Sequence, residues 1–185
     1  DAIEHVYKLK AFRYPTGGAV GTVRPLSNGA SVYVDHLVST LSEEKPLAGQ
    51  KIVLDCANGA AYSVSPAAFE ALGAEVVTLA VEPNGTNIND GVGSTHPEKL
   101  QEAVIKHGAD MGIAHDGDSD RCQAVDENGK LVDGDQIMAI LAVAAKNAGT
   151  LAQDTLVATV MSSLGLELYL KEHDINLVRT GVGDL

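Results

Sequence analysis

Short apolar runs alternate with helix-forming segments through the middle of this chain, and this alternation limits the folds that the chain can adopt. Lys51–Asp55 is an apolar run typical of a strand covered on both faces, and further strands are expected at 75–80 and 110–115. Helices are expected through 67–72 and over 99–107. Alternating strands and helices favour right-handed crossovers and parallel pairing. The pattern therefore predicts an α/β fold, with a three-layer mixed but mainly parallel sheet and helices on both faces.

Turn and cap residues indicate the elements on either side of this unit. The first 27 residues are expected to form an irregular lead-in, after which Ser27 or Asn28 could cap a helix over Ala30–Leu41. Further along, an Asn-Gly pair within 123–132 predicts a β-hairpin.

The strand and helix pattern starts again near the end of the chain. An Ala-rich helix is expected at about 135–147, and Gly149 is followed by a strand, a helix and another strand. We therefore divide the chain into a lead-in at 1–28, an α/β domain at 29–150, and the truncated start of a second α/β domain at 151–185.

Charge and cysteine content argue against some classes of protein. The chain has 185 residues and a formal net charge of −12, whereas a nucleic-acid or anionic-membrane surface would need clustered Lys and Arg. The sequence contains no apolar run long enough to span a bilayer. Its two cysteines, Cys56 and Cys122, follow no spacing motif and are typical of reduced thiols in a cytoplasmic protein.

Three aspartates at alternate positions, Asp116, Asp118 and Asp120, are followed at once by Arg121. Carboxylates packed this closely repel one another, so the loop favours a cation between them. Their oxygens suit Mg²⁺, Mn²⁺ or Ca²⁺, and the guanidinium of Arg121 matches the geometry of phosphate oxygens. Together these residues predict a catalytic metal site, with Mg²⁺ as the cofactor, that handles a phosphorylated small molecule.

Two other interpretations of the aspartate loop were weighed against this one. A solvated acidic loop is disfavoured because the alternation, the flanking strands and the adjacent arginine all agree with a metal site. A calcium loop of the EF-hand type would place Glu127 at its twelfth position, as required, but its sixth position needs glycine and holds Arg121. A non-catalytic module that binds divalent cations is kept as the alternative to an enzyme site.

Other polar segments carry weaker signals. The Gly-rich loop at 84–97 either lies beside the aspartates or only caps the next helix through Ser94 or Thr95. It is not a phosphate-binding loop, because the Gly-Lys-Ser/Thr ending is missing. His115 is interpreted as a residue that positions the aspartate loop. Asp133, at an expected helix start, is interpreted as a cap.

Several segments, which occur along the chain in the same order as in the family, resemble the α-D-phosphohexomutases. Asp116–Arg121 is similar to the metal-binding loop of that family, and 85–96 is similar to a loop of its bacterial members. Arg13–Gly17, Asp55–Ala60 and Val132–Gln136 extend the resemblance over nearly the whole chain.

The resemblance implies a four-domain enzyme that interconverts glucosamine 6-phosphate and glucosamine 1-phosphate through a phosphoserine in its first domain. Residues 29–150 would be the second, metal-binding domain. In this family Mg²⁺ bridges the phosphoserine and three aspartates, which match Asp116, Asp118 and Asp120, and Arg121 matches an arginine that contacts phosphate. The expected partners are a phosphosugar substrate and the other domains of the enzyme, with no nucleic acid and no membrane.

The resemblance also implies that parts of the enzyme are missing from this chain. The phosphoserine loop of the family, Thr-Ala-Ser-His-Asn-Pro, does not occur in the sequence, and neither do the sugar-binding and phosphate-binding loops of its last two domains. We therefore expect a piece of a longer protein without turnover of its own. Leu185, which stands where the family has arginine, is expected to be vector-derived. Members acting on mannose or glucose phosphates are the alternatives within the family.

Overall fold

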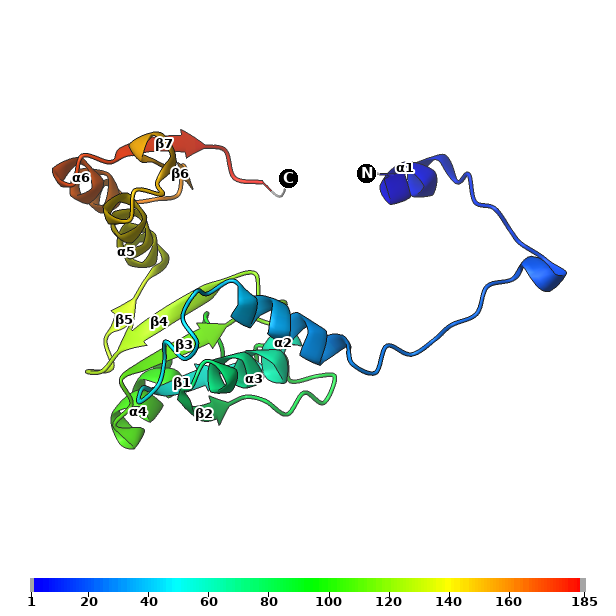
Figure 1. The fold of residues 1–185 in the computed structure, drawn as a ribbon, viewed down its shortest axis with the longest axis horizontal. Helices are drawn as coiled ribbons and strands as arrows, with labels where there is room; N and C mark the ends of the chain where they lie inside the picture. Colours follow the sequence, from blue (N-terminus) through cyan, green and yellow to red (C-terminus); the bar gives the residue numbers. More distant parts are fainter. Residues whose placement is uncertain (1, 184–185) are drawn as a thin grey trace.

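The structure of the protein is a computed structural model that describes residues 2–183. Its central feature is a five-stranded sheet in the order β2-β1-β3-β4-β5 (Figure 1). The strands are β1 (Lys51–Asp55), β2 (Glu75–Leu79), β3 (Met111–His115), β4 (Cys122–Asp126) and β5 (Leu131–Val132). β1 pairs in parallel with β2 and β3, whereas β4 pairs antiparallel with β3 and β5. The mixed sheet and the hairpin are as the sequence predicts.

Helices cover both faces of this sheet. On one face, Ile52 and Leu54 of β1 pack with Phe69 of α3 (Val64–Ala71). On the other face, Val53 packs with α4 (Glu98–His107). Alternate residues of β1 thus pack against opposite helix layers, as the two-residue period of a strand requires. Each buried aliphatic side chain contributes about 1.5–3 kcal/mol to the free energy of folding. α2 (Gly29–Ser39) lies against α3, which completes the predicted three-layer arrangement (Figure 1).

Helix ends agree only partly with the predicted caps. Gly108 ends α4 in the left-handed region, with a φ of 57°. Thr95 does not cap this helix, because α4 begins after Pro97. Asn28 occupies the position before α2, but its side chain makes no capping hydrogen bond.

The lead-in is not irregular throughout, contrary to the prediction. It contains α1 (Ala2–Leu9), in which Lys8 and Glu4 form an ion pair at 2.7 Å, and a 3-10 turn at Gly17–Ala19. None of the side chains of α1 is buried. Ile3, Val6 and Tyr7 have the spacing of one helix face, so the sequence carries a helical signal here that the prediction overlooked, and in Figure 1 this segment extends away from the sheet.

A second, smaller unit follows β5. It begins with α5 (Gly134–Asn147), where Asp133 and Gln136 form a capping box that confirms the predicted cap. The elements that follow are β6 (Thr155–Thr159), α6 (Leu164–Glu172) and β7 (Asn176–Thr180), with β6 and β7 parallel. Ala142 of α5 is buried in one core with Leu166 and Leu170 of α6.

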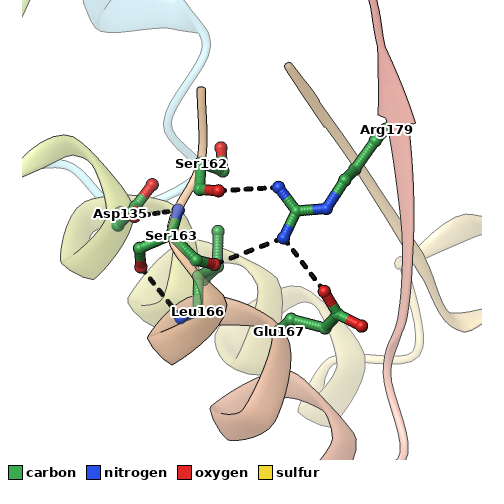
Figure 2. Close-up of polar contacts among 6 residues, drawn as sticks. All are labelled: Asp135, Ser162, Ser163, Leu166, Glu167 and Arg179. Carbon is green, nitrogen blue, oxygen red and sulfur yellow. Dashed lines mark hydrogen bonds and ion pairs between the residues drawn. The ribbon is translucent and has the colours of Figure 1, made fainter. Parts of the chain in front are cut away.

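Polar contacts join the same elements around the turn between β6 and α6 (Figure 2). The backbone N–H of Ser163 donates to Asp135 Oδ2 at 2.8 Å, so α5 holds this turn from one side. Arg179 of β7 donates to the carbonyl oxygen of Ser162 at 2.6 Å and to Glu167 at 3.0 Å, and holds it from the other side. α5, α6 and β7 are therefore linked by polar contacts as well as by apolar packing.

Within residues 2–183 no helix is both long and apolar enough to cross a membrane. The prediction made for Leu185 lies outside the described residues.

Candidate metal centre

The aspartate loop connects two paired strands. His115 at the end of β3 and Cys122 at the start of β4 are Cα partners, so residues 116–121 form the whole connection. The backbone N–H of Asp116 donates to the carbonyl oxygen of Arg121 at 3.3 Å, which closes the base of the loop. The flanking elements are strands, whereas an EF-hand loop lies between helices, so the structure agrees with discarding that interpretation.

The three predicted metal ligands, Asp116, Asp118 and Asp120, are brought together by this loop. One carboxylate oxygen from each lies within 4.8 Å of the others, with Asp116 buried and the other two exposed. Desolvation raises the pKa of Asp120, and the charges of Asp118 and Asp116 act in the same direction. Three hard oxygen donors that repel one another fit a divalent cation, so the group could bind such an ion.

Arg121 contacts the aspartates directly. Its Nε and Nη2 each lie 2.6 Å from Oδ2 of Asp116, and its backbone N–H donates to Oδ1 at 3.1 Å. Burial raises the pKa of Asp116, but the hydrogen bonds and charge of Arg121 outweigh burial, so this pKa is lowered overall. The contact between Arg121 and phosphate stays a prediction. The side chain of Arg121 is 67% exposed and so is accessible to a ligand.

His115 lies on the face of the sheet that α3 covers. Met111 and Ile113 pack toward α3, and the two-residue period puts His115 on the same face. Its Nε2 lies 2.9 Å from Oγ of Ser65 in the first turn of α3. Burial lowers the pKa of His115, although the charges of Asp116 and Asp55 oppose this. The contact with Ser65 anchors the end of β3, in line with a positioning role.

The Gly-rich loop at 84–97 lies against the aspartate loop. The backbone N–H of Ser94 donates to the carbonyl oxygen of His115 at 2.8 Å. Gly93 has a φ of 82°, and a Cβ at this position would lie 2.7 Å from both the Ala57 Cβ and the His115 carbonyl oxygen. Only glycine fits this backbone and this space. Of the two placements that the sequence left open, the structure shows the one beside the aspartates.

Asp55 is a residue of this region to which sequence reasoning gave no role of its own. Its carboxylate is fully buried at the end of β1 and accepts the backbone N–H groups of Ala57 and Gly93, each at 2.9 Å. Ala57 and Asn58 follow in the left-handed region, with φ of 53° and 48°, which is uncommon outside glycine. An aspartate at the carboxyl end of a fully apolar run is the signal that could have identified it, because a buried carboxylate needs partners.

Two models of protein families match the chain. The model described as phosphoglucomutase/phosphomannomutase, alpha/beta/alpha domain II, matches residues 31–129. The model of alpha/beta/alpha domain III of the same family matches residues 133–185.

Individual relatives agree with these matches. The chain is 59% identical over 186 residues to a phosphoglucosamine mutase from Symbiobacterium thermophilum and 59% identical over 184 residues to one from Kocuria rhizophila. These alignments cover 100% of this chain but 41% and 40% of the relatives, so the chain spans about two fifths of their length. A solved structure of a phosphoglucomutase/phosphomannomutase family protein from Burkholderia thailandensis is 26% identical, with a TM-score of 0.72, over 98% of this chain and 39% of that chain.

Proposed function

The chain belongs to the phosphoglucomutase/phosphomannomutase family, and from this premise we propose that it is the metal-binding part of a bacterial phosphoglucosamine mutase. The whole protein would interconvert glucosamine 6-phosphate and glucosamine 1-phosphate by way of a phosphoserine that this sequence does not contain. The observation that carries the proposal is the cluster of Asp116, Asp118 and Asp120 on a domain II fold. The names of the relatives at 59% identity support glucosamine over other sugars.

The cofactor that we propose is Mg²⁺, held by the three aspartates. When bound, such an ion withdraws electron density from phosphoryl oxygens and stabilises charge that develops there. Arg121 neutralises Asp116 through two nitrogens at 2.6 Å. With a cation held by the aspartates, the exposed guanidinium would be free to turn toward the oxygens of a phosphoryl group, which its planar fork fits well.

The proposed partners are a phosphosugar and the remaining domains of the enzyme. The net charge of −12 matches neither a nucleic-acid surface nor an anionic membrane. The free thiols of Cys56 and Cys122 support a location in the cytoplasm.

We also propose that the two domains in this chain divide at residue 132 rather than at residue 150. The domain II model ends at residue 129, and the domain III model begins at residue 133. α5 shares a core with α6, and its Asp135 accepts the backbone N–H of Ser163. α5 would thus open the third domain instead of closing the second.

Assays of the whole protein test the proposed activity. Glucosamine 1-phosphate, mannose 1-phosphate and glucose 1-phosphate would each be supplied with Mg²⁺ and a hexose bisphosphate that phosphorylates the serine. We expect the highest kcat/KM for the glucosamine phosphate, and no turnover by the present chain alone. A preference for a mannose or glucose phosphate would instead place the enzyme with the other mutases of the family.

A metal titration of the chain tests the proposed site. Asp118→Asn should weaken Mg²⁺ binding about tenfold or more while leaving the circular dichroism spectrum unchanged, because it replaces one of three charged ligands by a neutral amide oxygen. Asp90→Asn, which changes an exposed aspartate of the Gly-rich loop, is the matched control and should bind as the wild type does. If Ca²⁺ binds far more tightly than Mg²⁺ and its NMR shifts extend to Glu127, the protein is a cation-binding module instead.

A further inference from the structure

We propose that the buried carboxylate of Asp55 positions the metal ligand Asp116 through the Gly-rich loop, an inference that rests on the metal site proposed above. Asp55 and Asp116 stand at the carboxyl ends of the neighbouring parallel strands β1 and β3. Asp55 is not a member of the aspartate cluster and is fully buried. Its effect on the cluster would therefore be exerted through other residues.

Two hydrogen bonds make the connection. Oδ2 of Asp55 accepts the backbone N–H of Gly93 at 2.9 Å. The next residue, Ser94, donates its own backbone N–H to the carbonyl oxygen of His115 at 2.8 Å. That carbonyl belongs to the peptide bond that leads directly into Asp116. The Gly-rich loop thus contacts the ends of both β1 and β3, and Asp55 fixes its position.

The chemistry of this position requires a carboxylate. Oδ1 of Asp55 accepts the N–H of Ala57, and Oδ2 accepts the N–H of Gly93, so each oxygen serves a different donor. An asparagine side chain of the same shape offers one acceptor and one donor, and would leave one of these buried N–H groups facing another donor.

Two glycines give the Gly-rich loop little conformational restraint of its own, although its Asn89 N–H also donates to the carbonyl oxygen of Ala57 at 2.9 Å. Gly91 and Gly93 both have positive φ, at 61° and 82°, and glycine has the greatest freedom of any residue to leave such a conformation. The loop nevertheless touches the aspartate loop a second time, because a Cβ on Gly117 would lie 2.6 Å from Cδ1 of Ile88. A loop that is flexible by composition but closely packed needs an external anchor, and the Asp55 carboxylate supplies one.

The test compares two isosteric substitutions at opposite ends of β1. Asp55→Asn removes the proposed anchor. Asp110→Asn is the matched control, because Oδ2 of Asp110 accepts the backbone N–H of Lys51 at 2.7 Å, at the end of β1 far from the aspartates. Amide hydrogen exchange and NMR shifts are recorded on the metal-free chain, and Mn²⁺ binding is then titrated.

We expect Asp55→Asn to lower the exchange protection of Ser94 about tenfold, to shift the amide signals of residues 116–121, and to weaken Mn²⁺ binding about tenfold. Asp110→Asn should change none of these by a comparable amount. Unchanged Ser94 protection and unchanged loop signals in Asp55→Asn would overturn the inference. Equal changes in both variants would overturn it as well, because they would indicate a general loss of stability.

The amide measurements contain no metal, so they separate this inference from the proposed function. A wild-type chain that fails to bind Mn²⁺ contradicts the metal site, while the amide signals of Asp55→Asn still decide whether Asp55 positions the loop. If that variant does not fold, exchange in the wild type decides instead. The amides of Gly93, Ser94 and Asp116 should then show similar protection, and a Ser94 amide that exchanges as fast as one in an open loop would refute the connection.

Discussion

Carboxylates only a few residues apart in the aspartate loop have different properties because their surroundings differ. Asp116 is buried, which raises its pKa, yet the bonds and charge of Arg121 outweigh burial and lower the pKa overall. Desolvation and the charges of Asp118 and Asp116 raise the pKa of Asp120. Asp116 is thus charged and held in place by Arg121. A bound cation would stabilise the ionised form of Asp120 and so oppose the rise in its pKa.

The two cysteines should differ sharply in reactivity. Burial raises the pKa of the Cys56 thiol to about 12, and the charge of Asp55 acts in the same direction. Cys122 is exposed. At about pH 8 we expect one thiol to react with an aromatic disulfide in the folded chain and a second only after unfolding, because the thiolate is the reactive form. The control is Cys122→Ser, and rapid labelling of that variant would show that Cys56 is accessible.

At the scale of helices and strands, elements that bury apolar side chains could be predicted, and contacts between distant loops could not. Lys51–Asp55 was predicted within its limits because consecutive apolar residues enter the core. α1 was missed although Ile3, Val6 and Tyr7 have helical spacing, and the cap at Thr95 was wrong because α4 starts only after Pro97. The partner of Asp55 could not be predicted either, because Gly93 lies 38 residues away and contributes only a backbone N–H.

A methyl group at Gly59 should disturb the contact between two loops at the metal centre. A Cβ there would overlap the carbonyl oxygen of Gly117, whose position the backbone would have to change. We expect Gly59→Ala to cost about 1–3 kcal/mol of stability and to weaken Mg²⁺ binding as well. Urea denaturation and metal titration measure the two effects.

The control for Gly59→Ala is Gly112→Ala, which crowds the core instead. Its Cβ would lie 2.7 Å from both Leu100 Cδ1 and Val104 Cγ2, on the face covered by α4. A similar loss of stability with unchanged Mg²⁺ affinity is expected from this variant. If both variants weakened metal binding equally, the loop contact would have no special part in shaping the site.

The link between α5 and the turn before α6 should depend on pH. Hydrogen bonds from Ser163 lower the pKa of Asp135, and the charge of Arg179 assists. Because the folded pKa lies below the ordinary value, the contribution of Asp135 is complete above that ordinary value and is lost as the pH falls through the folded pKa. Asp135→Asn should therefore be less stable than the wild type at neutral pH and equally stable in strong acid. The urea midpoints of both proteins are measured across this pH range. A constant difference between the midpoints of Asp135→Asn and the wild type would contradict the link.

Residues 2–183 contain two sheets of unequal size. In the division proposed above, the larger unit is built on the five-stranded sheet, and the smaller on the β6-β7 pair with α5 and α6. A two-stranded sheet has little stability by itself, so the smaller unit depends on the packing of both helices against it. Assigning α5 to one unit or the other therefore changes how many apolar side chains each unit can bury.

Shortened chains test the division at residue 132. If α5 belongs with α6, chains comprising residues 29–132 and 29–150 should unfold at nearly the same urea concentration, because without α6 the helix α5 would keep only its few contacts with β4 in the longer one. The longer chain should also bind a fluorescent apolar dye, since the side of α5 that carries Ala142 would be exposed. A clearly higher midpoint for 29–150 would place α5 in the larger unit.

The connection between β3 and β4 also bears on the order in which the molecule folds. Only residues 116–121 separate these paired strands, so this hairpin forms from neighbours in sequence, and such contacts form sooner than distant ones. We therefore expect the three aspartates to assemble before Asp55 and Gly93, 38 positions apart, have met. A divalent ion captured at that stage would accelerate the folding reaction as well as oppose unfolding, so the supply of the ion during synthesis would influence how much of the chain reaches its native state.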